Sequence, residues 1–282
     1  MSLPIVPEKI RETLKAPGQP NETDLVERSG QLVCPQTGAT YRCDEGVPRL
    51  MRAEPAVPAP PQRRPSYAGI EEFGELVSKG YSDPFRRGLL KAIGTNKRVL
   101  DCGCGTGQLS HFLQLNNNQV LGVDTSLEDL RLAMAHRAHN QLTRVAFALM
   151  DPFDLAIKDA SMDVAVVRHA LQRASDPARS LQHVVSKVRR GGLVLVGVHS
   201  SFVPSGNSDP RHTIDEVLAW LAASGVDYVA CRPAVLGTDG EDSAVFAPSS
   251  PGSRYARFVT QLAWFFTNRR DGGTFDVLGR RR

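Results

Sequence analysis

The chain has 282 residues, of which 41% are hydrophobic, 23% charged and 6% aromatic. This composition argues against wholesale disorder, and the length fits one large domain or a domain with a small appendage, at roughly 100–200 residues per domain. The net charge of +4 does not indicate nucleic acid as a partner, no apolar run reaches the ~18 residues of a membrane span, and no secretory signal opens the chain, so we expect a cytoplasmic protein.

The N-terminal part differs in pattern from the rest. Residues 1–52 contain the strand-like pairs Leu32-Val33 and Thr40-Tyr41 between turn residues, which predicts a small β-rich unit with a hairpin. Residues 53–66 are rich in proline and predict an extended linker. We therefore expect the main domain to occupy residues 67–282.

Two helices are expected at the start of the main domain, over 70–79 and 84–93. From Lys97 onward, short apolar runs alternate with helical patterns, and we expect Gly191-Gly192 to break the helix before them. Because the strand-like runs are continuously apolar, they predict an α/β fold with a parallel sheet that helices cover on both faces. The expected strands span 98–100, 119–123, 145–150, 164–167, 193–198, 226–231 and 274–279, and the helices span 109–115, 127–138, 178–188, 214–223 and 255–266.

A glycine-rich loop, DCGCGTG over residues 101–107, follows the first of these strands. Loops at the carboxyl ends of parallel strands bind ligands, and glycines allow close backbone approach. The spacing does not fit the dinucleotide pattern G-x-G-x-x-G, whose third glycine falls on Gln108 or Ser110, and no lysine follows as in a P-loop. Asp101 would repel a pyrophosphate but suits a ligand that carries an ammonium group.

Four further segments follow the loop in order: VLGVDTS at 120–126, MDPF at 150–153, DVAVVRHAL at 163–171, and Asp176-Pro177 with VRRGGL at 188–193. With the glycine loop, they resemble the landmarks of class I S-adenosylmethionine-dependent methyltransferases of the type 11 or UbiE-like group. The resemblance covers about Tyr81–Ser200 and, more loosely, Thr213 to the end. It implies a Rossmann-like, seven-stranded, mostly parallel sheet.

The resemblance also implies S-adenosylmethionine as the cofactor. Asp124 matches the family acid that holds the ribose hydroxyls, and Asp151 the one near the adenine amino group. A carboxylate can accept a hydrogen bond from each of these groups and from the ammonium. Alternatively, Asp124 caps a helix and Asp151 forms an ordinary turn. The expected cofactor-binding residues are Asp101, Gly103, Gly105, Gly107, Asp124, Thr125, Asp151, Pro152 and Arg168.

His169 follows the fourth strand and is the candidate general base, with a packing role as the alternative. His199, after the fifth strand, is a second candidate at the same edge. Tyr67, Phe73 and Tyr81 lie where related enzymes cover the cofactor and substrate. The N/D-P-P-Y/F motif of nucleic-acid amino methyltransferases is absent after the fourth strand.

The N-terminal cysteines Cys34 and Cys43 resemble the distal half of a Trm112-like zinc-ribbon module. Because a structural zinc needs four ligands, we expect no metal. The resemblance favours methyl transfer to oxygen or nitrogen of a small-molecule acceptor, with nucleic acid an unlikely partner. A non-catalytic scaffold with the same fold, and an RNA or protein methyltransferase that needs a partner, remain open. The sequence does not predict the oligomeric state.

Overall fold

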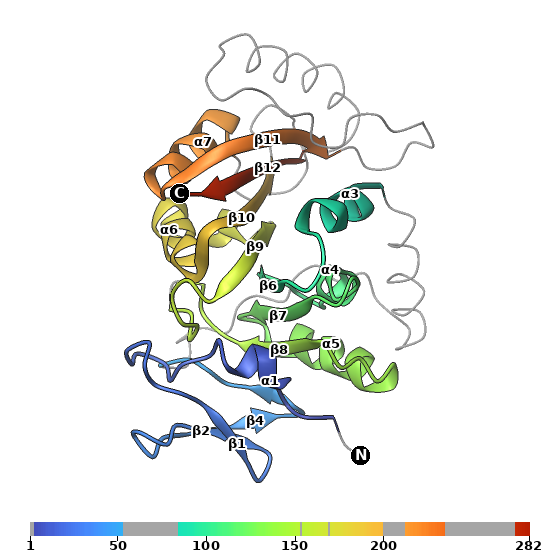
Figure 1. Ribbon diagram of the computed structural model, residues 1–282, viewed down its shortest axis with the longest axis vertical. Helices are drawn as coiled ribbons and strands as arrows, with labels where there is room; N and C mark the ends of the chain where they lie inside the picture. The colour runs from blue at the N-terminus through green and yellow to red at the C-terminus, as the bar shows by residue number, and fades with distance from the viewer. Residues whose placement is uncertain (1–2, 53–83, 153, 169, 200–211, 235–273) are drawn as a thin grey trace.

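A computed structural model describes residues 3–52, 84–152, 154–168, 170–199, 212–234 and 274–282 (Figure 1). The proline-rich linker and the helices expected over 70–79 and 255–266 lie outside these residues. So do His169 and the aromatic residues Tyr67, Phe73 and Tyr81. Within the described ranges, no helix is both long enough and apolar enough to cross a bilayer.

The centre of the fold is a seven-stranded sheet in the order β11-β12-β10-β9-β6-β7-β8 (Figure 1). β12 is antiparallel to both of its neighbours, and the other paired strands run parallel. Each of the seven strands predicted from the sequence is present. Their bounds are β6 Arg98–Cys102, β7 Gln119–Asp124, β8 Val145–Leu149, β9 Met162–Arg168, β10 Val188–His199, β11 Val226–Ala234 and β12 Thr274–Arg281.

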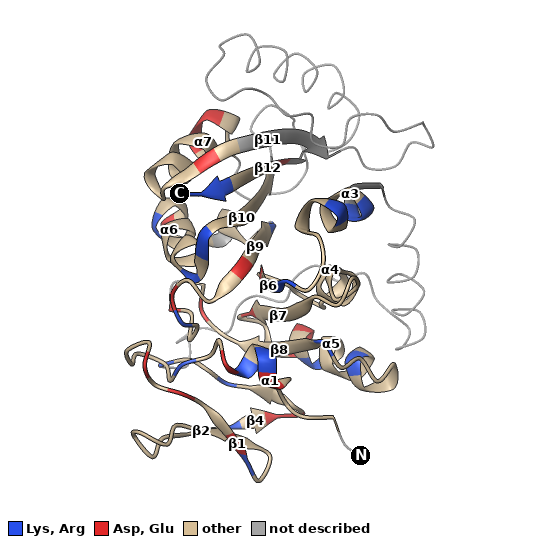
Figure 2. Ribbon diagram, in the orientation of Figure 1, with Lys and Arg blue, Asp and Glu red and all other residues tan. Residues whose placement is uncertain are grey.

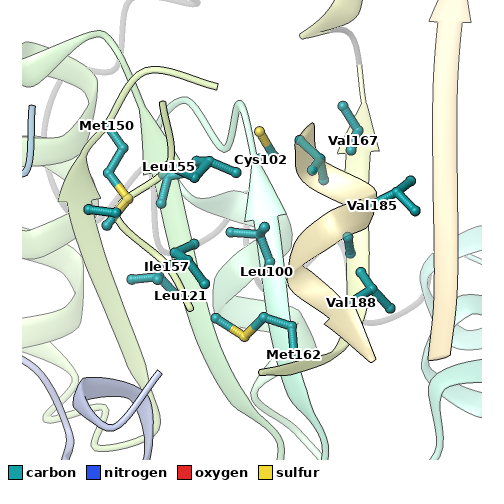
Figure 3. Packing of buried hydrophobic residues seen from close by; sticks show 14 of the residues in the cluster. Leu100, Cys102, Leu121, Met150, Leu155, Ile157, Met162, Val167, Val185 and Val188 are labelled. Carbon is teal, nitrogen blue, oxygen red and sulfur yellow. The ribbon is translucent and has the colours of Figure 1, made fainter. Parts of the chain in front are cut away.

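Helices cover both faces of this sheet, which explains the continuously apolar strands. Successive residues of β6 point to opposite sides, so that Leu100 joins one buried cluster and Val99 the other. The first cluster packs against α6 (Pro177–Lys187) and α7 (Ile214–Ala223), and Figure 3 shows Leu100, Cys102 and Val185 among its side chains. The second packs against α3 (Pro84–Ile93), α4 (Gln108–Leu113) and α5 (Leu127–His139).

The helix boundaries follow local capping chemistry. Thr213 begins α7 with a capping box, because its hydroxyl accepts from the Glu216 N–H while the Glu216 carboxylate accepts from the Thr213 N–H. Asp176 caps α6 by accepting from the Arg179 N–H. Both caps stand next to the predicted helix starts.

The expectation that Gly191-Gly192 break a helix is wrong. α6 ends earlier, at Lys187, and the two glycines lie inside β10, where the register with β9 shifts between Val188 and Leu193. Gly191 has a φ of 73°, and a Cβ on Gly192 would lie 2.6 Å from the Asp163 carbonyl oxygen. The glycines therefore permit an irregularity in a strand.

The N-terminal segment, residues 3–52, forms small sheets of its own. The predicted hairpin is present, with Leu32 opposite Tyr41. A three-stranded sheet has the order β1-β2-β3, and β4 pairs with β5. The elements are α1 Glu8–Arg11, β1 Val26–Arg28, β2 Gln31–Val33, β3 Thr40–Tyr41, β4 Cys43–Asp44 and β5 Val47–Pro48.

This segment shares its core with the large sheet, beside β8 (Figure 1). Ile10 and Leu14 are fully buried in the same cluster as Leu121 of β7. The connection from β8 to β9 contains no helix in its described residues. Instead, the Lys158 N–H donates to the Thr13 carbonyl at 2.8 Å, and the Lys15 N–H to the Ala156 carbonyl at 3.0 Å. The N-terminal segment thus covers the sheet where a crossover helix would otherwise lie.

Arg137 of α5 fixes the start of the segment. Its side chain is 1% exposed, and its Nη1 and Nη2 donate to the carbonyls of Ile5 and Pro4 at 3.0 and 2.7 Å. Arg131, on the same helix, instead makes an exposed ion pair with Glu45. One helix therefore contacts the segment through both a buried and an exposed guanidinium.

We expect Arg137→Ala to lower the free energy of unfolding by roughly 2–4 kcal/mol, because a buried guanidinium loses two charge-assisted hydrogen bonds and the packing of its side chain. The matched control Arg131→Ala should cost less than about 1 kcal/mol. Urea denaturation of both variants measures the difference. Equal effects would contradict a structural role for the buried contact.

Candidate active site

A cavity of about 460 Å³ lies at the carboxyl ends of the central strands. Its volume is in the range of small-ligand sites, ~300–1,000 Å³, and its place is where open α/β sheets bind ligands. Gly107 is not among the residues that line it. The cavity is lined by eight of the nine residues that the sequence suggests for the cofactor: Asp101, Gly103, Gly105, Asp124, Thr125, Asp151, Pro152 and Arg168.

The glycine loop is tied to the end of β7. The N–H groups of Gly103 and Cys104 donate to the Val123 carbonyl at 2.8 and 3.1 Å, and the Gly105 N–H donates to Asp124 Oδ2 at 2.8 Å. Gly103 and Gly105 have φ values of 79° and 52°. Because side chains disfavour this left-handed region, glycine is the residue that gives the loop this path.

Two of the loop glycines are also required by close packing. A Cβ on Gly103 would lie 2.4 Å from the Cβ of Ala170, and one on Gly107 would lie 2.6 Å from the Phe147 ring. Gly107 precedes α4 and packs the loop against β8. Its contribution is therefore to packing, and no contact with the cavity is seen.

Asp101 and Asp124 are 3% and 7% exposed. Burial raises the pKa of Asp101 to about 6, although the Ser110 hydroxyl, 2.6 Å from its Oδ2, and the nearby Arg168 favour the ionised form. Burial also raises the pKa of Asp124, against the backbone N–H groups of Ser126 and Gly105. A hydrogen-bond donor or a cation in the cavity would stabilise the ionised form of both carboxyl groups.

The alternatives left open for the two other strand ends can now be compared with the structure. Ser126 is the N-cap of α5, since its hydroxyl accepts from the Asp129 N–H, so Asp124 is not that helix's cap. Asp151 does form a turn, because its carbonyl accepts from the Asp154 N–H at 2.9 Å. Asp151 also lines the cavity, so it can form this turn and contact a ligand as well.

The turn after β8 is held from two sides. The His183 Nε2 of α6 accepts from the Leu155 N–H at 3.0 Å, which requires a neutral imidazole. Burial lowers the pKa of His183 to about 4, consistent with that state. From the N-terminal segment, Arg52 Nε pairs with Asp154 Oδ2 at 2.8 Å.

Two charged residues at the site are not found by sequence reasoning. Arg86, among the basic residues of α3 shown in Figure 2, lines the cavity, and its Nη2 lies 3.5 Å from Gln108 Oε1. Asp276 of β12 is fully buried, and its Oδ1 accepts from Arg168 Nε at 3.0 Å. Arg86 was not found because the helical pattern of α3 does not indicate which of its side chains lies at the cavity. Asp276 was not found because it is 108 positions away from Arg168 in the sequence. The remaining lining residues are Cys102, Cys104, Thr106, Gln108, Leu109, Val123, Ala170 and Ala174.

The candidate base is not placed by the structure. His169 lies outside the described residues, directly after Arg168 at the end of β9. The backbone of His199 ends β10, and its side chain is not described. The described part of the chain holds no group of three or more His, Cys, Asp or Glu residues suited to a metal ion.

Comparison with known proteins identifies relatives of this domain. Residues 93–224 match the family described as methyltransferase domain. A ubiquinone biosynthesis O-methyltransferase of Leptothrix cholodnii is 31% identical over 47% of this chain and 51% of its own length. A malonyl-[acyl-carrier protein] O-methyltransferase of Hamiltonella defensa is 34% identical over 38% and 40%, respectively.

The fold recurs in solved structures. The [4+2]-cyclase SpnF superimposes with a TM-score of 0.51 at 20% identity, over 70% of this chain and 81% of the cyclase. The chain spans about half the length of the first curated relatives it matches. The family match over residues 93–224 and the seven-stranded sheet agree with the resemblance seen in the sequence, since both are similar to methyltransferase domains of this fold.

Proposed function

We propose that the protein is an S-adenosylmethionine-dependent methyltransferase that acts on oxygen or nitrogen of a small-molecule acceptor. The observation that carries this proposal is the gathering of three strand-end carboxylates, Asp101, Asp124 and Asp151, around a left-handed glycine loop in one cavity. The relatives are named as O-methyltransferases of ubiquinone biosynthesis and of malonyl-[acyl-carrier protein], which supports O-methylation.

The charges of the cavity suit this cofactor. Three carboxylates and two guanidinium groups line it, which leaves one net negative charge when all are ionised. S-adenosylmethionine carries a sulfonium, an ammonium and a carboxylate, and so one net positive charge. Complementary net charge favours binding in a partly desolvated site.

Each part of the cofactor has a residue of suitable chemistry. Asp101 would accept from the ammonium and Asp124 from the ribose hydroxyls, while Asp151 and Pro152 would border the adenine. Arg168 would hold the carboxylate. The backbone of Gly103, Gly105 and Thr125 would allow close approach, as the left-handed loop leaves room for a ligand.

When bound, the cofactor supplies a methyl group on a positively charged sulfur. The chain's contribution is then to align an acceptor with that group and to exclude water. Where the acceptor carries a proton, a base is needed. We propose His169 for this role, because it follows Arg168 at the ligand edge of the sheet.

Two other functions compete with this proposal. The fold alone does not imply methyl transfer, since a [4+2]-cyclase shares it. The first competing function is a non-catalytic scaffold, and the second is an RNA or protein methyltransferase that needs a partner. The buried carboxyl groups of Asp101 and Asp124 on the cavity wall argue for ligand binding, because a scaffold gains nothing from desolvated carboxyl groups that border a cavity. An RNA-binding form would retain nucleic acid on purification, which the ratio of absorbance at 260 and 280 nm detects.

We also propose that residues 1–52 serve the methyltransferase domain as an intramolecular cover. Support comes from the buried Ile10 and Leu14 and from the Arg52–Asp154 ion pair beside the cavity turn.

Calorimetric titration with S-adenosylmethionine tests the proposed cofactor. We expect micromolar binding to the full chain, and a loss of ~1–3 kcal/mol, or about 5- to 150-fold in affinity, for Asp124→Ala. Asp159→Ala is the control, because Asp159 pairs with Lys187 away from the cavity and should affect stability only. A folded wild-type protein that binds neither this compound nor S-adenosylhomocysteine would refute the proposal.

The affinity should also depend on pH through Asp101. Burial raises the pKa of Asp101 to about 6, and only the carboxylate form attracts an ammonium. Affinity should therefore be constant between about pH 6.5 and 7.5 and fall as the pH decreases below 6, approaching tenfold per pH unit. Asp101→Asn should bind weakly and without this slope. A slope that persists in Asp101→Asn would exclude Asp101 as its origin.

A further inference from the structure

Three residues lie in one row across neighbouring strands. Arg168 of β9 is the register partner of Gly197 in β10, and Gly197 is the register partner of Asp276 in β12. Residues in register across a sheet point to the same face. The row therefore lies on the face covered by α3, α4 and α5, the face of Asp101 and Ser110.

The middle position of the row must be glycine. A Cβ on Gly197 would lie 2.3 Å from Asp276 Oδ1, 3.1 Å from Arg168 Cγ and 3.2 Å from Arg168 Nε. The side chains of Arg168 and Asp276 thus meet directly above β10, in the space that a side chain there would fill. Gly197 does not line the cavity, so a need for ligand contact does not explain it.

The ion pair has a buried end and a cavity end. Asp276 is fully buried, whereas the Arg168 side chain is 25% exposed and lines the cavity. Burying a carboxylate costs free energy unless the carboxylate is paired. Because a buried ion pair often adds little net stability to the fold, its presence does not by itself indicate a stabilising role. The bond to Asp276 is made by Nε of Arg168. This anchors the guanidinium at one edge, which restricts its orientation toward the cavity.

We propose that Asp276 is a positioning residue that holds the Arg168 guanidinium in place to bind the carboxylate of the cofactor's methionine moiety. This inference rests on the proposed function. It makes β12 a part of the cofactor site, although Asp276 itself does not line the cavity.

The position of Asp101 favours a carboxylate as the partner of Arg168. Asp101 of β6 is in register with Val166 of β9, and Arg168 lies two positions further on the same face. Arg168 is also close enough to favour the ionised form of Asp101. An α-amino acid carries its ammonium and carboxylate on one carbon. A neighbouring carboxylate and guanidinium match that pair of charges, with the guanidinium able to make two parallel hydrogen bonds.

Two probes separate this role from a purely structural one. S-adenosylhomocysteine has the amino-acid moiety, whereas 5′-methylthioadenosine has the same adenosine and sulfur without it. We expect Asp276→Asn, in the full chain, to weaken calorimetric binding of S-adenosylhomocysteine by about tenfold, and to leave the affinity for 5′-methylthioadenosine within about twofold. Gly197→Ala and Arg168→Lys should show the same selective loss of affinity for S-adenosylhomocysteine. These two variants replace Asp276→Asn in the test if that variant does not fold.

Asp163→Asn is the matched control. Asp163 pairs with Arg189 at the opposite end of β9, so its loss should affect stability without changing either affinity. Equal weakening of both probes by Asp276→Asn, or no weakening of either, would overturn the positioning role. Failure of the wild-type protein to bind either probe would instead refute the proposed cofactor, and this inference with it.

Discussion

The hydrogen bonds between the glycine loop and the end of β7 are the constraint on which the cavity depends. Val123 and Asp124 together receive three backbone N–H groups of the loop. The loop can make these bonds only along a left-handed path, which glycine adopts at little cost. Asp124 thus has two functions: its carboxylate completes the loop and forms part of the cavity wall. A change of the loop or of Asp124 would alter the shape of the site and its charge together.

The N-terminal segment covers a part of the sheet that the β8–β9 connection leaves without a helix. That connection crosses the sheet without a helix in its described residues, and apolar side chains of β7 would otherwise be exposed. Residues of the segment bury this surface and hydrogen-bond to the connection itself, through Thr13 and Lys15. The same connection begins with the turn at Asp151, which lines the cavity, and Arg52 of the segment pairs with Asp154 in that turn. The segment therefore contacts both the core of the domain and the connection that borders its site.

Sequence patterns predict the parts of this protein that local chemistry determines. The seven strands, the hairpin at Leu32 and the capping box at Thr213 depend on side chains close in the sequence, as do the glycines of the loop. The misplaced break at Gly191 has a tertiary cause, because β10 needs a bulge against β9. Arg86 and Asp276 were missed for the same reason. Their roles depend on which strand or helix becomes a neighbour, and no local pattern encodes that.

We infer that one cavity recognises the separate parts of S-adenosylmethionine through residues from separate strands. A crystal structure of the protein with S-adenosylhomocysteine tests it most directly. We expect the amino group at Asp101, the ribose hydroxyls at Asp124, the adenine beside Asp151 and the carboxylate at Arg168. Electron density for the ligand outside this cavity, or inside it with the ribose away from Asp124, would contradict the account.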